Sequence, residues 1–220
     1  QRSQRKLRSS GEGQVQCQRR LRVKAAARPQ FTQVATFADT ILNTRRQISV
    51  PIKNIGAANL VLSSKLSLSA AFVCLSPTPL TIPGGETRSL IFEFRPTKAG
   101  AVTSSVLFAA NVPGRYLYFT LSGKGIRGPT LQLTPASMAF STPPGASHAR
   151  TITLTNIGDL PLTWAATVES SGTWLTLTIP GGTLAPGQSQ IVPVVINTAL
   201  MPTGSHKAQI SLTSNDAARP

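Results

Sequence analysis

One short motif occurs twice in the sequence, about 102 residues apart. Residues 48–60 read ISVPIKNIGAANL, and residues 150–162 read RTITLTNIGDLPL. In both copies alternating apolar residues lead into an Asn-Ile-Gly step, and a leucine follows the glycine four residues later. The later matches keep the same order: Pro83-Gly84 with Pro186-Gly187, Gly100 with Gly204, and Asn111 with Asn215. The sequence therefore predicts two copies of one domain.

Apolar side chains recur at every second residue within each copy. Residues 151–155 read Thr-Ile-Thr-Leu-Thr, and residues 90–94 place Leu90, Phe92 and Phe94 on one side. This period is typical of half-buried strands, and turn residues separate the runs every 8–12 positions. We expect the glycine of each Asn-Ile-Gly step to adopt a positive φ at a turn. Short, evenly spaced strands predict an all-β fold of two β-sandwiches.

Charge is distributed unevenly along the chain. The 220 residues contain 22 Lys and Arg against 7 Asp and Glu, a net charge of +15. Residues 1–28 carry a net +8, residues 29–127 carry +7, and residues 128–220 are neutral. Residues 1–28 are predicted to be a disordered basic arm because so few apolar side chains cannot offset the entropy of ordering. The Gly/Pro-rich stretch 125–129 separates the predicted domains, 29–127 and 128–220.

No pattern of reactive residues occurs in the sequence. Cys17 and Cys74 lie in different environments, and His148 and His206 lie far from both, so neither a disulfide framework nor a zinc site is indicated. No nucleophile elbow or phosphate-binding loop is present. We therefore expect no catalytic, metal or cofactor-binding residues, no cofactor and no enzymatic activity. No apolar run is long enough to predict a membrane-spanning helix.

Four residues are candidates for a binding surface. Arg115, Tyr116 and Tyr118 belong to one expected strand, where the two tyrosines share a face that is either a binding patch or ordinary solvated strand. Trp174 is either a sugar-stacking platform or part of the core. Trp164 continues an apolar series and is expected in the core. Cys74 is expected to be a buried small hydrophobe.

Residues 46–126 resemble the ASH/HYDIN-type immunoglobulin-like domain, which is related to major sperm protein domains. The resemblance depends on residues 82–85 (Ile-Pro-Gly-Gly), Phe94-Arg-Pro96 with Gly100 after it, and the closing Leu-Ser-Gly-Lys-Gly of residues 121–125. It implies an immunoglobulin-like sandwich without catalytic function. The expected fold is thus two tandem immunoglobulin-like β-sandwiches preceded by the disordered basic arm.

Residues 129–215 resemble the same group less closely. Trp174-Leu175, the Pro186-Gly187 turn, Gly204 and the Ser214-Asn215-Asp216 end are similar to BACON-like and choice-of-anchor modules of bacterial multidomain proteins. Together the two resemblances imply a binding or spacing module. Such modules occur in bacterial surface proteins and in ciliary or centrosomal scaffolds, and the cell surface is slightly favoured here.

The second copy is expected to lack its last strand. The first copy continues past Asn111 through Arg115 to Leu121, and the equivalent strand of the second copy would begin near Arg219. A sandwich without this strand exposes an unpaired edge. Either the sequence is a fragment, which we favour, or a partner supplies the strand.

Three functional hypotheses follow from the sequence. The leading one is a non-catalytic module that spaces or docks a larger multidomain protein, with a protein or further domains of the same polypeptide as partner. The second is carbohydrate or surface adhesion through aromatic residues of the second domain. The third is binding of nucleic acid or an anionic surface by the basic arm, which would be strongly salt-dependent.

Overall fold

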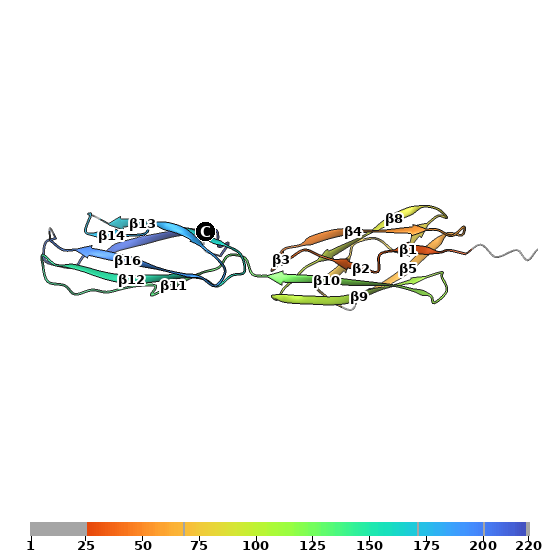
Figure 1. Ribbon diagram of the computed structural model, residues 1–220, viewed down its shortest axis with the longest axis horizontal. Helices are drawn as coiled ribbons and strands as arrows, with labels where there is room; N and C mark the ends of the chain where they lie inside the picture. The colour runs from red at the N-terminus through yellow and green to blue at the C-terminus, as the bar shows by residue number, and fades with distance from the viewer. Residues whose placement is uncertain (1–25, 68, 171, 200, 219–220) are drawn as a thin grey trace, which may run out of the picture.

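The computed structural model describes residues 26–218 except residues 68, 171 and 200. Most of the expected basic arm lies outside these residues, so its disorder stays a prediction. Every regular element in the described part is a β-strand. The strands build two sandwiches that lie end to end and are joined by one connection (Figure 1). The predicted all-β fold of two tandem sandwiches is confirmed.

The first sandwich contains ten strands in two sheets. They are β1 (Pro29–Phe31), β2 (Val34–Thr36), β3 (Thr40–Ile41), β4 (Arg46–Asn54), β5 (Leu60–Ser67), β6 (Phe72–Cys74), β7 (Leu80–Ile82), β8 (Thr87–Phe94), β9 (Gly100–Ala110) and β10 (Tyr116–Ile126). One sheet has the order β1-β4-β8-β6, and the other has the order β2-β10-β9-β5-β7 with β3 also beside β10. Both β2 and β3 pair with β10 in parallel, whereas the other pairs are antiparallel.

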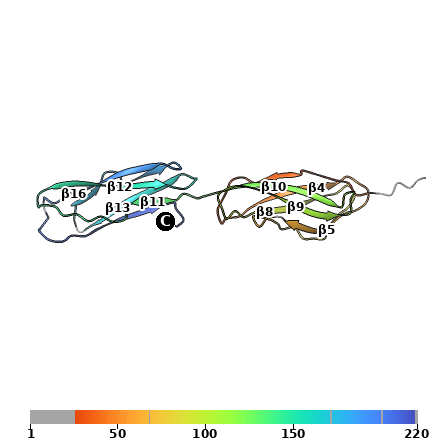
Figure 2. The same cartoon turned by 90° about the horizontal axis from the view of Figure 1, so that it is seen from below.

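The second sandwich repeats this arrangement with seven described strands. They are β11 (Leu131–Thr134), β12 (Ser147–Asn156), β13 (Leu162–Ser170), β14 (Leu175–Leu177), β15 (Gly181–Leu184), β16 (Ser189–Asn197) and β17 (Ala208–Ser214). Its sheets have the orders β11-β12-β16-β14 and β15-β13-β17. The view turned by 90° again shows the two sandwiches end to end, joined by a single stretch of chain (Figure 2).

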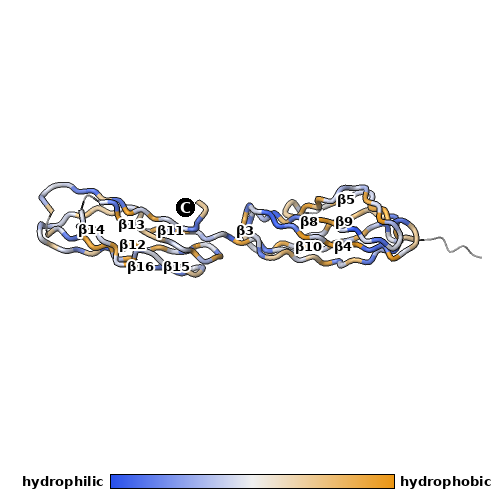
Figure 3. The backbone as a smooth tube through the Cα atoms, turned by 90° about the horizontal axis from the view of Figure 1, so that it is seen from above, coloured by the Kyte–Doolittle hydropathy of each residue, from blue (hydrophilic) through white to orange (hydrophobic). Residues whose placement is uncertain are grey.

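Each sandwich has its own apolar core, formed by the inward side chains of alternating strands. Five phenylalanines are almost completely buried in the first core: Phe72, Phe92, Phe94, Phe108 and Phe119. The second core is aliphatic apart from Trp164, which is 5% exposed, so its expected core position is confirmed. Figure 3 shows the resulting alternation of apolar and polar segments along the strands of both domains.

The Asn-Ile-Gly motif of the first domain connects three segments of chain through one buried amide. The Asn54 side chain accepts hydrogen bonds at Oδ1 from Arg28 N and Gly56 N, both at 3.1 Å. Its Nδ2 donates to Ala58 O at 2.7 Å and to Ile82 O at 2.9 Å. The fully buried side chain thus satisfies backbone groups that would otherwise lie unpaired inside the domain.

Asn156 makes the same four contacts in the second domain. Its Oδ1 accepts from Thr130 N at 3.4 Å and from Gly158 N at 3.0 Å. Its Nδ2 donates to Leu160 O at 2.8 Å and to Leu184 O at 3.0 Å. The repeated motif therefore contains an internal polar clamp, and this is why its asparagine and glycine occur in both copies.

The expectation of a positive φ at the motif glycines is wrong. Neither Gly56 nor Gly158 has a positive φ, unlike the turn glycines Gly85 and Gly187. A Cβ on Gly56 would lie 2.1 Å from Ala26 O, and a Cβ on Gly158 would lie 2.0 Å from Gly128 O. Glycine is required here because another stretch of backbone passes directly over it, not because of its conformational freedom.

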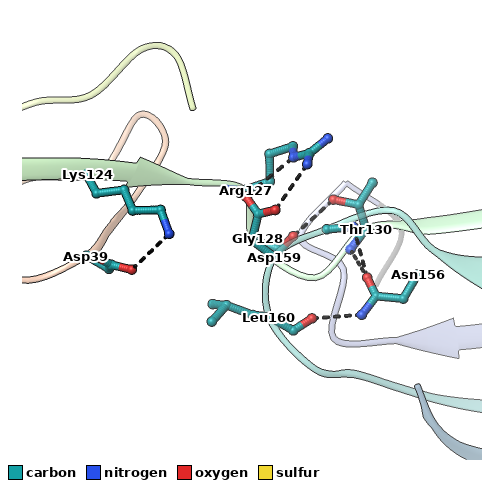
Figure 4. A network of polar contacts seen from close by, with 9 residues as sticks. Asp39, Lys124, Arg127, Gly128, Thr130, Asn156, Asp159 and Leu160 are labelled. Carbon is teal, nitrogen blue, oxygen red and sulfur yellow. Dashed lines mark hydrogen bonds and ion pairs between the residues drawn. The ribbon is translucent and has the colours of Figure 1, made fainter. Parts of the chain in front are cut away.

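The connection between the domains is held by an ion pair. Asp159 Oδ2 accepts a hydrogen bond from Arg127 N at 2.7 Å, and its Oδ1 lies 3.0 Å from Arg127 Nη2 (Figure 4). These contacts lower the pKa of the Asp159 carboxyl. On the first-domain side, Lys124 Nζ lies 3.8 Å from Asp39 Oδ2. Both pairs border a cleft of about 620 Å³ between the domains.

Candidate interaction surface

The outer face of the sheet containing β10 carries exposed apolar side chains. Tyr116 and Tyr118 on β10 are 49% and 53% exposed, and Leu66 on β5 and Val34 on β2 are 58% and 56% exposed. With half-buried Leu107 of β9, these residues form a surface that we call the tyrosine face. Its members come from four strands and from positions far apart in the sequence.

The register of the sheet places these side chains side by side. Tyr118 pairs with Leu107, and Leu107 pairs with Leu66, so the three form a row across β10, β9 and β5. The ring centroids of Tyr116 and Tyr118 lie 6.4 Å apart. Val34 pairs with Thr120, two residues beyond Tyr118 on the same face. Adjacent exposed aromatic and aliphatic groups of this kind mark interaction sites more often than scattered ones do.

The alternation of β10 directs both tyrosines outward. Leu117, Phe119 and Leu121 point into the core and are at most 5% exposed, so the residues between them face solvent. Arg115 precedes them in the turn from β9 to β10, with a φ of 62° and its backbone N bonded to Val112 O. The structure therefore brings three of the four candidate residues, Arg115, Tyr116 and Tyr118, to one edge of the tyrosine face.

The positive charge of the first domain is not compensated by free acidic groups. Each acidic side chain of residues 29–127 already forms an ion pair with a basic one: Asp39 with Lys124, Glu86 with Arg88, and Glu93 with Arg95. The net charge of +7 over these residues is thus carried by basic groups beyond those pairs. The domain offers an apolar aromatic face on a positively charged body.

Trp174, the fourth candidate, lies in the second domain. It is half-buried, packs against the core there, and has its ring centroid 6.4 Å from that of His206. The two residues border a hollow of about 430 Å³ together with Asn197 and Met201. The four candidate residues therefore belong to two separate places. Trp174 packs against the core on one side and borders the hollow on the other, so it combines features of a core residue and of a sugar-stacking platform.

The described residues contain no cluster suited to metal binding. No group of three or more His, Cys, Asp or Glu side chains lies close enough there to hold a metal ion. Cys74 is free and buried, as expected, and burial raises the pKa of its thiol. No helix in residues 26–218 is long and apolar enough to cross a membrane.

The comparisons with known proteins bear mainly on the second domain. Residues 129–220, which include all strands of the second sandwich, match the family model described as HYDIN/CFA65/VesB-like, Ig-like domain. The second domain is therefore similar to HYDIN-type Ig-like domains. A BACON-like or choice-of-anchor identity for this domain is not supported, because the match is to the group whose resemblance we placed in residues 46–126. No curated protein matches the sequence.

Solved structures of similar architecture are distant. An ASH/PapD-like domain of human CEP192 is 18% identical with a TM-score of 0.38, covering 46% of this chain and 86% of that one. The secreted serine protease VesC from Vibrio cholerae is 11% identical with a TM-score of 0.38, covering 86% of this chain and 51% of that one. A protein of unknown function from Porphyromonas gingivalis is 16% identical with a TM-score of 0.38, covering 86% and 94%.

Three members of the tyrosine face were missed by sequence reasoning. Leu66, Leu107 and Val34 look like ordinary strand residues, and nothing in their local sequence distinguishes them from core positions. The parallel pairing of β2 with β10 brings Val34 to this face, and a bulge between Leu62 and Ser64 shifts the register that places Leu66 there. Neither feature has a signal in the sequence.

Proposed function

We propose that this chain is a non-catalytic interaction module that docks a protein partner through the tyrosine face of its first domain. The observation that carries the proposal is the row Leu66–Leu107–Tyr118 with Tyr116 and Val34 beside it. Tyrosine is enriched at the energetically dominant positions of protein interfaces because it combines a large apolar ring with a polar tip. The similarity of residues 129–220 to HYDIN-type Ig-like domains also supports a role as an interaction module.

The charge around the face indicates the chemistry of the partner. The acidic groups of the first domain are paired internally, so its unpaired charge is positive. A partner with an apolar patch bordered by acidic side chains would therefore be attracted over long range and oriented correctly. Arg115, exposed at the edge of the face, is positioned to meet such an acidic border.

The tandem arrangement supports a second part of the proposal, which is spacing. Arg127 and Asp159 limit the freedom of the connection through a side-chain pair and two backbone hydrogen bonds. Two sandwiches joined in this way hold what is attached at either end at a defined separation. Carbohydrate binding through Trp174, nucleic-acid binding by the basic arm, and location at the cell surface stay predictions.

A photo-crosslinking amino acid at position 118 tests the docking proposal. Introduced into the 220-residue chain, it should capture a discrete protein partner in cells that express the chain. The same group at Ile191, which is 58% exposed on β16 of the other domain, should not capture that protein. Identical cross-links from both positions would show that the tyrosine face is not a specific site.

The affinity of the captured partner then measures the contribution of the tyrosines. Replacing Tyr116 and Tyr118 by serine should weaken binding by at least about ten-fold, since each aromatic anchor at an interface contributes about 1–2 kcal/mol or more. The control variant Ile191→Ser should bind as the unaltered chain does. Because all three side chains are exposed, neither variant should change the unfolding temperature appreciably. Equal affinity of all three proteins would refute the proposal.

A further inference from the structure

One surface of the second domain has no part in the functions proposed above. It is the outer face of the sheet β11-β12-β16-β14, whose strands all lie between residues 131 and 197. The inward residues of the two central strands are at most 4% exposed; they are Ile152, Leu154, Val192, Val194 and Ile196. Their neighbours on β12 and β16 therefore point outward. We call the outward set the threonine face: Gln132, Thr134, Ser147, Ala149, Thr151, Thr153, Thr155, Thr176, Ser189, Ile191, Pro193, Val195 and Asn197.

All the side chains of the threonine face are uncharged. The matching face of the first domain does contain charges. The pairing registers place Thr155 where the first domain has Lys53, and Val195 where it has Glu93. Charged groups on the outer face of a sheet oppose its burial, because they lose hydration when another surface covers them. The threonine face lacks this protection against association.

An aliphatic strip runs along β16 within the threonine face. Ile191 is 58% exposed, and Pro193 and Val195 beside it are half-buried. The register places the strip against a row of threonines on β12, with Thr153 opposite Ile191 and Thr151 opposite Pro193. Contiguous aliphatic and β-branched side chains without charge are typical of surfaces that another protein covers.

The threonine face is complementary in shape to itself. On β16 the large Ile191 lies on one side of Pro193 and the smaller Val195 on the other, and on β12 Thr153 and Ala149 follow the same order. A two-fold axis that crosses the strands at Pro193 reverses this order in a second copy. Ile191 then lies over Val195, and Thr153 lies over Ala149, so that each larger side chain meets a smaller one.

We propose that the threonine face binds the threonine face of a second copy of the chain, in an antiparallel dimer whose two-fold axis crosses the strands at the pair of Thr151 and Pro193. The two sheets stack face to face at about 10 Å, the usual separation of stacked sheets. The aliphatic strips form the dry centre of the contact, and the threonine hydroxyls at its rim stay hydrated or form hydrogen bonds across it.

Charge decides between the two possible orientations of such a dimer. Residues 128–220 carry no net charge, so two second domains do not repel each other. Residues 29–127 carry a net +7, and the two sandwiches of one chain lie end to end (Figure 1). A parallel dimer would place two positive first domains side by side, whereas the antiparallel dimer places them at opposite ends.

The size of the threonine face is sufficient for a reversible dimer. The nine residue pairs between β12 and β16 extend over about 30 Å, and the sheet is about 17 Å wide. Two such faces bury about 1,000 Å² in all, close to the lower limit for a specific interface. The proposal does not depend on the tyrosine face, which lies on the other domain. A cross-linking group at Ile191 would capture a second copy of the chain and not the partner of the tyrosine face.

Sedimentation velocity of the 220-residue chain, from micromolar to near-millimolar concentration, measures the dimer. Ile191→Lys should raise the dissociation constant at least about ten-fold, because the dimer then buries two ammonium groups. Thr151→Lys, at the axis, should have the same effect. The matched control is Ile91→Lys on the corresponding sheet of the first domain, where Ile91 is 40% exposed and the dimer should be unchanged. Because the contact contains no charged groups, added salt should not weaken the dimer.

Cysteine cross-linking tests the orientation. In a Cys17→Ser background, the thiol of Thr151→Cys lies at the axis and faces its own copy across about 10 Å. The thiol of Thr155→Cys, four residues along the strand, lies about 25–30 Å from its copy in the antiparallel dimer. A thiol cross-linker that spans about 10 Å should therefore join the first variant and not the second.

Each contrary outcome overturns the proposal. A chain that stays monomeric at near-millimolar concentration has no such contact. A dimer that Ile191→Lys and Thr151→Lys leave intact is formed by another surface. A dimer that is lost when Tyr116 and Tyr118 are replaced by serine, and kept in Ile191→Lys, is formed by the tyrosine face. Equal cross-linking through positions 151 and 155 shows a parallel arrangement, which contradicts the proposed axis.

Discussion

Replacing Asn54 by alanine should destabilise the first domain strongly and leave the second domain unaffected. The buried amide donates two hydrogen bonds and accepts two, at 2.7–3.1 Å, from three separate stretches of chain. At a net value of about 1 kcal/mol for each hydrogen bond, the loss is about 4 kcal/mol. A domain of this size has a total stability of about 5–15 kcal/mol, so the variant should be near the limit of folding.

Calorimetry of the 220-residue chain measures this effect. The first-domain transition should move down by on the order of 20 °C, given about 4–8 °C per kcal/mol for domains of this size. Asn156→Ala should shift the other transition by a similar amount, because Asn156 makes the same four contacts. The matched control is Asn111→Ala, which removes two hydrogen bonds at an exposed turn and should cost only about 1 kcal/mol.

The outcome distinguishes a clamp from an ordinary turn residue. If Asn54→Ala costs no more than Asn111→Ala, the backbone groups around position 54 find other partners and the amide is not the element that joins the three segments. If both domains are destabilised by a change in one of them, the two sandwiches unfold as a single cooperative unit rather than separately.

Three further predictions concern the backbone contacts, the pH dependence and the connection between the domains. Gly158→Ala should destabilise the second domain by more than the roughly 1 kcal/mol expected for Gly187→Ala, since its Cβ would lie 2.0 Å from a backbone oxygen whereas Gly187 faces open space; urea denaturation compares the two. Hydrogen bonds from Gln47 and Arg95 lower the pKa of the buried Glu93 carboxyl. The ionised carboxylate therefore stabilises the folded first domain above the unfolded pKa of about 4.3, and this stabilisation is lost as the pH falls through the folded pKa. Glu93→Gln should therefore lower stability at neutral pH and flatten the decline in acid, and parallel acid denaturation curves would contradict this assignment. Arg127→Ala removes the side-chain pair with Asp159, so X-ray scattering should show a broader range of domain separations while both unfolding transitions stay in place.

Local pattern accounts for those parts of the fold that depend on single strands. The alternation in residues 116–121 predicts which side chains of β10 point inward, and the exposure of Tyr116 and Tyr118 follows directly from it. The recurrence of Asn-Ile-Gly predicts two copies of one domain, because the clamp needs the same asparagine and glycine each time. These features are encoded within a few consecutive residues, which is why they can be read without the structure.

Features that depend on pairing between distant segments could not be read in this way. The parallel contacts of β2 and β3 with β10 join residues more than 80 positions apart, and the sequence contains no local sign of them. The role of Gly56 was misread because its constraint comes from Ala26, a residue on a different segment.

The parallel contacts of β2 and β3 with β10 have a mechanical consequence. When the chain is stretched from its two ends, the start of the first sandwich and its last strand are drawn in opposite directions along these shared contacts. The hydrogen bonds are then loaded in shear and must break together, which makes forced unfolding slow.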